Sequence, residues 1–250
     1  MVKFYNRIEK GKFRLTFFVH QSNFLTVMIV LTILKPNKGV WKMKILVTGG
    51  SGFVGKEVIR QALMQGHTVA YLSRHEGQGK LFENPMVTHI KVDLVKNQKM
   101  TLPNNYDVIV HLVGAIKPND LQLLNVQAMR GVIKLAVENQ IEQLIYLSAR
   151  VGYPAYLKSK QEAEELLKAS GLTYGILQSG LIYGTERPLA SIIGQISRYC
   201  NQLPLLGKLV TVLSPIPVQE VAQVLLEKVK TKPASFTEKL IHLYIKKNSL

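Results

Sequence analysis

The chain has 250 residues, of which 47% are hydrophobic and 19% charged, so it can hold one α/β domain with a full core but not two large domains. Its single cysteine, Cys200, excludes an intramolecular disulfide and a cysteine-rich metal site. The formal net charge of +16 is dispersed, with no basic stripe interleaved with aromatic residues, which argues against specific nucleic-acid recognition.

Residues 1–42 are expected to lie outside the fold. Eight basic residues and one acidic residue give them a net charge of +7, which leaves +9 for the rest of the chain. The run FLTVMIVLTIL (24–34) resembles the apolar part of a signal peptide, but no small-residue cleavage site follows it. It is also shorter than the ~20 residues of a membrane span. Residues 16–34 therefore predict at most a weak membrane association.

A second interpretation is that translation starts at Met43, directly before the first predicted strand. Codons for Lys38-Gly39-Val40 can contain a bacterial ribosome-binding sequence, with two codons as the spacer. On this interpretation the protein is cytoplasmic. If residues 1–42 act as an anchor instead, it is held peripherally or N-terminally at the membrane.

From Met43 onward, short apolar runs alternate with segments of helical periodicity. Strands are predicted at residues 44–49, 68–73, 88–93, 107–113, 143–148 and 173–179, and helices are predicted to begin near Phe53, Leu121 and Tyr156. Strands that are apolar throughout are buried on both faces, as in a parallel sheet covered by helices. The pattern predicts a Rossmann-type, doubly wound α/β domain.

After GLIYG (180–184) this alternation ends. Helices are predicted over 187–203 and 217–229, and a last strand or short helix over 239–247. These elements are too few for an independent domain. They predict a small cap from about residue 185, beside the carboxyl ends of the strands, where ligands of such sheets bind.

The glycine-rich segment VTGGSGFVG (47–55) lies between the first predicted strand and the first predicted helix. Gly49 permits a tight turn, Gly52 lets the backbone approach a pyrophosphate, and Gly55 lets the helix pack closely on the strand. The helix N-terminus offers N–H groups and the positive end of its dipole to phosphate. This context predicts a dinucleotide-binding loop consisting of Gly49, Gly50, Ser51, Gly52, Phe53, Val54 and Gly55.

The second predicted strand ends in YLSRHEG (71–77), without the acidic residue that usually binds the ribose 2′-hydroxyl of NAD. Ser73 and Arg74 occupy that place, and a guanidinium can bind a 2′-phosphate through two hydrogen bonds. Glu76 lies too far along the chain to argue for NAD. The sequence therefore predicts a preference for NADP(H), with NAD(H) as the alternative.

Candidate catalytic groups follow the fifth predicted strand, which ends at Ser148. Tyr156 and Lys160 lie four residues apart, on one face of a helix. A tyrosine has an ordinary pKa of about 10, and a nearby cation such as Lys160 favours its phenolate and so its role in proton transfer. Lys160 could also hold the cofactor ribose, and Ser148 could orient a substrate carbonyl or hydroxyl. These three residues are the predicted catalytic set.

The segments TGGSGFVG, HLVGA, NVQAMRGVIKLA, LIYLSA, YLKSKQEAEELL and GLIYG occur in the order and spacing of the extended and atypical short-chain dehydrogenase/reductases. Over about residues 43–225 the chain resembles their NAD(P)-binding, epimerase/dehydratase-like branch, which includes the dehydrogenase-like accessory subunit of respiratory complex I.

This resemblance implies further site residues. Asp93 and Leu94 would flank the adenine, and Asn125 would lie near the active site. Leu181 and Ile182 would contact the nicotinamide end through their backbone. The residues that would line the cofactor after the fourth strand are Val113, Gly114 and Ala115.

The chain also departs from the family pattern. Gln178-Ser179 stand where the family often has Arg-Pro, Glu220 stands where it has aspartate, and Gly131 replaces a frequent asparagine. Because these changes fall mainly on the substrate side, the resemblance predicts cofactor binding more firmly than a particular reaction.

The sequence as a whole predicts an NADP(H)-dependent oxidoreductase that acts on a carbonyl, hydroxyl or sugar-like small molecule. Two alternatives remain open: a nucleotide-sugar epimerase or dehydratase, against which the short C-terminal cap argues, and a non-catalytic NAD(P)H-binding sensor or assembly protein. The six histidines lack metal-ligand spacing, so no metal is expected. His111 is either a pocket residue or a hydrogen-bonded core histidine, and the carboxylates of EAEELL (162–167) are expected on a solvated face.

Overall fold

The computed structural model describes residues 4–9, 12–17, 42–96, 100–187, 215–230 and 234–248. The chain forms two units, Met1–Trp41 and Lys42–Leu250. In the first unit, β1 (Phe4–Glu9) and β2 (Lys12–Phe17) pair as antiparallel strands, a hairpin that the sequence did not predict. The apolar run at 24–34 lies outside the described residues. Among the helices that are described, none combines the length and the hydropathy that a bilayer span requires.

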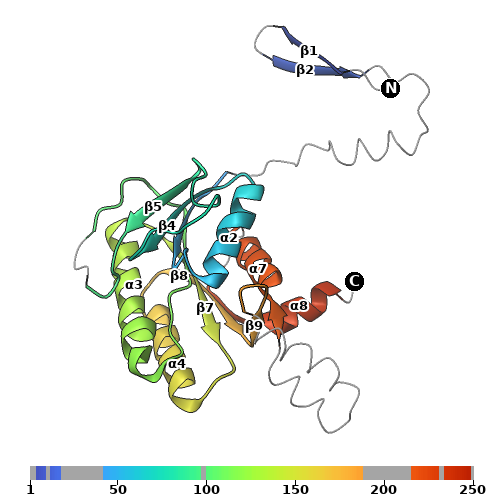
Figure 1. The fold of residues 1–250 in the computed structure, drawn as a ribbon. Helices are drawn as coiled ribbons and strands as arrows, with labels where there is room; N and C mark the ends of the chain where they lie inside the picture. Colours follow the sequence, from blue (N-terminus) through green and yellow to red (C-terminus); the bar gives the residue numbers. More distant parts are fainter. Residues whose placement is uncertain are drawn as a thin grey trace. The chain divides into compact units, whose positions relative to one another are not determined.

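The second unit is built on a seven-stranded sheet in which all neighbouring strands are parallel (Figure 1). Its strands are β3 (Lys44–Thr48), β4 (Thr68–Ser73), β5 (Val87–Lys91), β6 (Val108–His111), β7 (Gln143–Ala149), β8 (Thr173–Ser179) and β11 (Phe236–Lys239). Their order across the sheet is β11-β8-β7-β6-β3-β4-β5, so the direction of strand succession reverses between β3 and β6. The predicted Rossmann-type fold is confirmed, and the reversal marks the edge where such sheets bind ligands.

All six predicted strands are present, and β11 was missed. The sequence of β11, FTEK, has no apolar run, because β11 pairs only with β8 and its residues alternate between half-buried and exposed. The last predicted element, a strand or short helix over 239–247, is the helix α8 (Leu240–Asn248).

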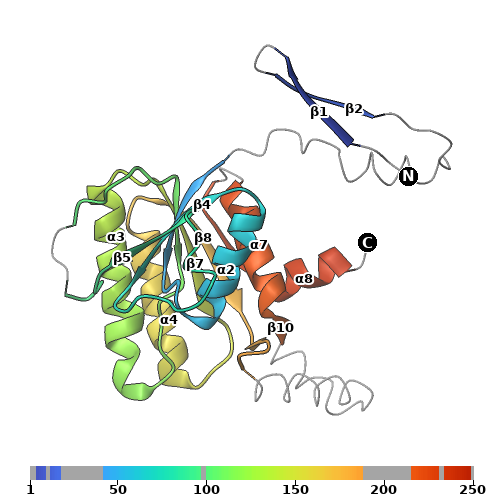
Figure 2. The same ribbon diagram turned by 45° about the horizontal axis from the view of Figure 1, so that its top comes forward.

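Helices cover both faces of the sheet, as Figures 1 and 2 show from two directions. One face carries α3 (Ala128–Glu138) and α4 (Pro154–Lys168), and the other carries α2 (Phe53–Met64) and α7 (Val218–Lys230). Successive residues of β3 serve both cores: Ile45 is buried with α2 and α7, whereas Leu46 is buried with α3 and α4. This two-sided burial explains why the strands are apolar throughout.

Helices α2, α4 and α7 begin within two residues of their predicted starts, whereas α3 begins seven residues after the start predicted near Leu121. The segment before α3 is less regular than expected, because a 3-10 turn, η1 (Pro118–Asp120), and a π-helix, η2 (Gln122–Gln127), lead into it. In the predicted cap, the short strands β9 (Ile182–Tyr183) and β10 (Ile216–Pro217) form a parallel pair. The helix predicted over 187–203 lies outside the described residues except for Arg187.

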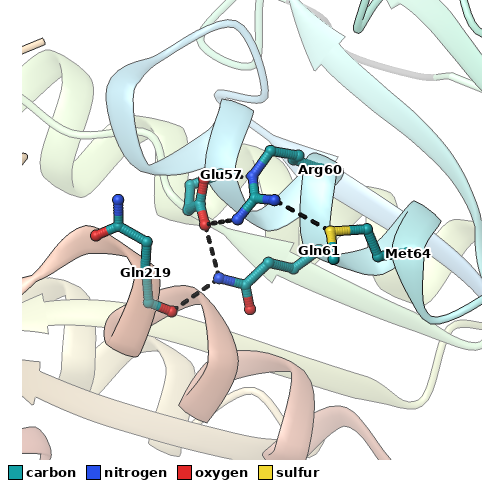
Figure 3. Close-up of polar contacts among 5 residues, drawn as sticks. All are labelled: Glu57, Arg60, Gln61, Met64 and Gln219. Carbon is teal, nitrogen blue, oxygen red and sulfur yellow. Dashed lines mark hydrogen bonds and ion pairs between the residues drawn. The ribbon is translucent and has the colours of Figure 1, made fainter. Parts of the chain in front are cut away.

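Helix α7 belongs to the layer over the sheet, because Val221, Leu225 and Val229 are buried together with Val58 of α2. A polar contact also joins the two helices (Figure 3). The Gln61 side-chain amide donates to Glu57 Oε1 at 2.7 Å and to the backbone carbonyl of Gln219 at 2.9 Å. Helix α7 is thus fixed against the helix whose N-terminus follows the glycine-rich loop.

Candidate cofactor and catalytic site

The glycine-rich loop connects β3 to α2 in the way the sequence predicts. Gly49 adopts a φ of +72°, and a Cβ there would lie 3.2 Å from the backbone nitrogen of Val113. A Cβ on Gly55 would lie only 2.3 Å from the Gly49 carbonyl oxygen, so only glycine lets α2 pack this closely. Gly52 precedes the first residue of α2, and no side chain caps the helix. The N–H groups of its first turn are therefore available to a phosphate.

The segment after β6 joins this loop to the predicted catalytic helix. A Cβ on Gly114 would lie 3.0 Å from Asn125 Oδ1 and 3.4 Å from Lys160 Nζ. The fully buried Asn125 accepts from the Ala115 N–H at 2.9 Å and donates to the Ala115 carbonyl at 3.0 Å and to Ser159 Oγ at 2.8 Å. Asn125 therefore fixes the loop against α4 from its place in the π-helix η2.

Lys160 lies deep beneath this loop. The residue is only 5% exposed. Its Nζ donates to the Leu147 carbonyl at 3.1 Å and lies 4.6 Å from the centre of the Tyr146 ring. Burial lowers the pKa of Lys160 to about 8, and the negative charge of Glu164 opposes this shift. At neutral pH the ammonium form persists in a largely apolar environment.

Tyr156 is half-buried on the same helix, beside Tyr153, whose ring centre is 6.0 Å from its own. Burial raises the pKa of Tyr156, and the positive charge of Arg187 acts in the opposite direction. The sequence assigned this cationic effect to Lys160. In the structure the Lys160 ammonium contacts the Leu147 carbonyl and the Tyr146 ring. The cation whose charge opposes the rise of the Tyr156 pKa is Arg187.

Arg187 was missed because no local pattern distinguishes it from other basic residues after GLIYG. Its guanidinium carbon lies 4.7 Å from the ring centre of Phe53, the first residue of α2. The neighbouring Glu186 forms an ion pair with Lys56 at 3.1 Å, which ties the turn to α2. Arg187 therefore places a positive charge beside the first residue of α2, and this charge also acts on Tyr156.

Ser148 does not present its hydroxyl in the way the sequence suggested. The residue is 3% exposed, and its hydroxyl donates to Glu164 Oε1. Glu164 is itself 3% exposed, whereas its neighbour Glu165 is exposed, so the predicted solvated face is wrong for Glu164. A helical spacing signal was present, because Tyr156, Lys160 and Glu164 recur every four residues.

His111 is a hydrogen-bonded core residue, the second of the two alternatives. It is fully buried, Nδ1 lies 2.7 Å from Thr48 Oγ1, and its ring centre lies 5.5 Å from that of Tyr146. Burial, with a smaller effect of the Lys160 charge, lowers the pKa of His111 to about 3. The imidazole is therefore neutral at physiological pH.

At the end of β4, Arg74 is exposed, as a ligand for a 2′-phosphate must be. The Ser73 hydroxyl already donates to the His75 carbonyl and lies 3.1 Å from His89 Nε2. Of the predicted pair, Arg74 is the residue whose side chain makes no hydrogen bond or ion pair with the described part of the chain.

The remaining residues implied by the resemblance are held by backbone contacts. Asp93 Oδ1 accepts from the Val95 N–H at 3.0 Å. A Cβ on Gly131 would lie 2.0 Å from the Leu94 carbonyl oxygen, which explains why this position lacks the family's asparagine. The Leu181 carbonyl accepts from the Ile216 N–H at 2.8 Å, and Ile182 lies opposite Ile216 in the β9–β10 pair.

Together these residues fit a dinucleotide. The uncapped helix N-terminus suits a pyrophosphate, and the glycine positions keep the loop clear of side chains. Lys160 and Tyr156 would hold the ribose and the reacting end, and Arg74 lies at the end of the strand where the adenosine ribose binds in such folds.

Comparisons with known proteins identify the family and the fold of this chain. A family model described as NAD(P)H-binding matches residues 49–232. The photosystem II assembly factor Ycf39 of Synechocystis sp. is 26% identical over 150 residues, which make up 57% of this chain and 46% of that protein. The match thus spans less than half the length of this relative.

Two solved structures share the fold. The Bordetella bronchiseptica enzyme WbmH in complex with NAD+ has a TM-score of 0.59 at 16% identity, over 79% of this chain and 75% of that chain. The UDP-Glc/GlcNAc 4-epimerase of Campylobacter jejuni has a TM-score of 0.58 at 15% identity, over 83% of this chain and 84% of that chain. The resemblance to epimerase-like folds is confirmed. Because the family match covers well over half of the chain, from the glycine-rich loop past the end of α7, the chain belongs to the NAD(P)H-binding family.

Proposed function

We propose that the chain is an NADP(H)-dependent oxidoreductase of the short-chain dehydrogenase/reductase type that acts on a carbonyl, hydroxyl or sugar-like small molecule. The observation that carries the proposal is the segment Val113–Gly114. A Cβ on Gly49 would lie 3.2 Å from the backbone nitrogen of Val113, and a Cβ on Gly114 would lie 3.4 Å from Lys160 Nζ, so this segment runs beside both the turn of the glycine-rich loop and the Lys160 ammonium. We therefore expect the dinucleotide loop and the helix with Tyr156 to line one site.

The residues of this site suit proton transfer to or from a substrate oxygen. When bound, the nicotinamide supplies or accepts the hydride. Because its pKa is raised, the Tyr156 phenol stays protonated at neutral pH and can donate to a carbonyl oxygen as that oxygen gains negative charge. In the reverse direction the phenolate must form, which the positive charge of Arg187 favours. Lys160 keeps an ammonium next to Gly114, where it can bind the ribose hydroxyls.

The preference for NADP(H) is supported by Arg74. It is exposed at the carboxyl end of β4, and no acidic side chain takes its place there. A guanidinium in this position favours the doubly charged 2′-phosphate over a 2′-hydroxyl.

A second candidate is a cofactor-binding assembly or sensor protein without turnover. It is favoured by the likeness to the photosystem II assembly factor and by the Ser148 hydroxyl, which is bound to Glu164 and not presented to a substrate. On this candidate, bound NADP(H) would stabilise a surface for a partner protein. Epimerisation of a nucleotide sugar has only the fold likeness in its favour.

The test begins with the full chain purified under native conditions. We expect mass spectrometry of the denatured preparation to reveal NADP(H), and a panel of carbonyl compounds and nucleotide sugars to elicit substrate-dependent oxidation of NADPH. A protein that binds neither NADP(H) nor NAD(H) would refute the proposal outright. Tight binding without oxidation by any compound would favour the assembly candidate.

A further inference from the structure

Glu164 is a buried carboxylate behind the catalytic pair, on the sheet side of α4. It lies one helical turn after Lys160 and accepts three hydrogen bonds. The Ser148 hydroxyl donates to Oε1, and the Gln178 side-chain amide lies 3.1 Å from Oε1 and 3.0 Å from Oε2. A carboxylate removed from water is costly unless hydrogen bonds and an opposite charge compensate it, so its presence here requires a reason.

The other titratable groups around Lys160 cannot balance its charge. Burial keeps His111 on β6 neutral, with its pKa lowered to about 3, and burial raises the pKa of Tyr146 on β7. Tyr156 on the same helix is also neutral at physiological pH, because burial raises its pKa. The charged side chains of the adjacent helix α3 are exposed; they are Arg130, Lys134 and Glu138.

Glu164 is therefore the negative charge available to the Lys160 ammonium among the described residues that surround it. The direction of its effect agrees, because the Glu164 charge raises the pKa of Lys160 against the lowering by burial. Both residues are at most 5% exposed, and charges interact more strongly in a medium of low dielectric constant than in water.

We propose that Glu164 is a positioning residue for the proposed reaction: its buried carboxylate keeps the Lys160 ammonium charged at neutral pH and, through Ser148 and Gln178, holds α4 against β7 and β8. The consequence for turnover rests on the proposed function. The effect on Lys160 does not, because it belongs to the protein without cofactor. A merely structural Glu164 would hold the helix in place without changing the proton affinity of Lys160.

The experiment measures the Lys160 pKa in the full chain without cofactor. Lysine labelled with carbon-13 at Cε gives one NMR signal per residue, and the spectrum of Lys160→Met assigns the Lys160 signal. In the unsubstituted protein we expect titration near pH 8. In Glu164→Gln, which keeps the shape of the side chain and removes its charge, we expect the Lys160 pKa to fall by about one unit or more.

The matched control is Glu165→Gln on the same helix, where the carboxylate is exposed and pairs with Lys168 at 2.7 Å. This variant should leave the Lys160 pKa unchanged. An unchanged Lys160 pKa in Glu164→Gln would overturn the proposal. If Glu164→Gln does not fold, Glu164→Asp retains the charge and should keep the Lys160 pKa near 8; a fall as large as about one unit despite the retained charge would overturn it equally.

A second readout links the effect to the cofactor. Fluorescence titration with NADPH should show that Glu164→Gln loses affinity at a lower pH than the unsubstituted protein, because its Lys160 loses its proton earlier. If the Lys160 pKa falls in Glu164→Gln but the unsubstituted protein turns over no substrate, the effect of Glu164 on Lys160 is supported and the oxidoreductase proposal is refuted.

Discussion

Burial of the Lys160 ammonium has an electrostatic cost, and this cost should appear in the pH dependence of stability. In the unfolded chain Lys160 holds its proton up to its ordinary pKa of 10.5, whereas in the folded chain it releases the proton near pH 8. Between these values the unfolded state binds more protons, so the free energy of unfolding rises with pH. The contribution of Lys160 to this rise is at most about 3 kcal/mol.

Denaturant unfolding of the unsubstituted protein and of Lys160→Met between pH 8 and 10.5 measures this contribution. Other groups titrate in the same range, so the difference between the two proteins is the informative quantity. We expect the unsubstituted protein to gain stability relative to Lys160→Met as pH rises. A constant difference would show that Lys160 keeps an ordinary pKa in the folded state.

Arg74 decides the cofactor preference in our proposal. Replacing it with alanine removes charge-assisted hydrogen bonds to the 2′-phosphate, so NADPH should bind about 10- to 100-fold more weakly while NADH is little affected. Fluorescence titration with both nucleotides checks this, with Lys80→Ala, an exposed basic residue of the following loop, as the control. Equal weakening of both nucleotides by Arg74→Ala would rule out the 2′-phosphate role.

Single residues of the site could be predicted from the sequence only where a local pattern marks them. The glycine-rich loop and the Tyr156–Lys160 spacing are local, and both were found. The burial of Glu164, the direction of the Ser148 hydroxyl and the approach of Arg187 to Phe53 depend on contacts between distant segments. No spacing rule reveals those contacts.

At the level of elements, the contact between α3 and the loop after β5 sets a strict size limit. Gly131 leaves no room for a Cβ, which would lie 2.0 Å from the Leu94 carbonyl oxygen. Alanine would ordinarily stabilise a helix by about 1 kcal/mol relative to glycine. Here we expect Gly131→Ala to destabilise the protein by about 1–3 kcal/mol, because α3 or the loop must shift.

Denaturant unfolding measures this effect, and Arg130→Ala, an exposed change on the same helix, should stay within about 0.5 kcal/mol of the unsubstituted protein. The loop on the other side of this contact contains Leu94, which is expected at the adenine. Affinity for NADPH should therefore fall in Gly131→Ala as well. A stabilised Gly131→Ala protein would contradict the packing described for this contact.

The helices and strands that the sequence predicted most readily are those whose residues are most buried. Strands in the middle of the sheet are apolar on both faces, and their runs are readily identified. The edge strand β11 has one neighbour and a polar sequence, and the irregular turns η1 and η2 follow no periodicity. The other edge strand, β5, was identified, so the polar sequence of β11 and not its edge position alone concealed it.

At the scale of the whole molecule, the described core residues all come from position 43 onward. The unit Lys42–Leu250 contains both core clusters, the complete sheet and the candidate site. We therefore expect a chain that begins at Met43 to unfold at nearly the same temperature as the full chain and to bind NADPH with the same affinity. Loss of cooperative unfolding in the shortened chain would show that residues 1–42 support the fold.

The most direct test of the central claim compares the full chain with Tyr156→Phe, which removes only the phenolic hydroxyl. Both proteins are titrated with NADPH and then assayed for its oxidation with the panel of carbonyl compounds and nucleotide sugars. We predict equal NADPH affinity and a loss of turnover of at least about 100-fold in Tyr156→Phe, because the proton donor is gone. Equal turnover by the two proteins, or none by either despite tight NADPH binding, would contradict the account.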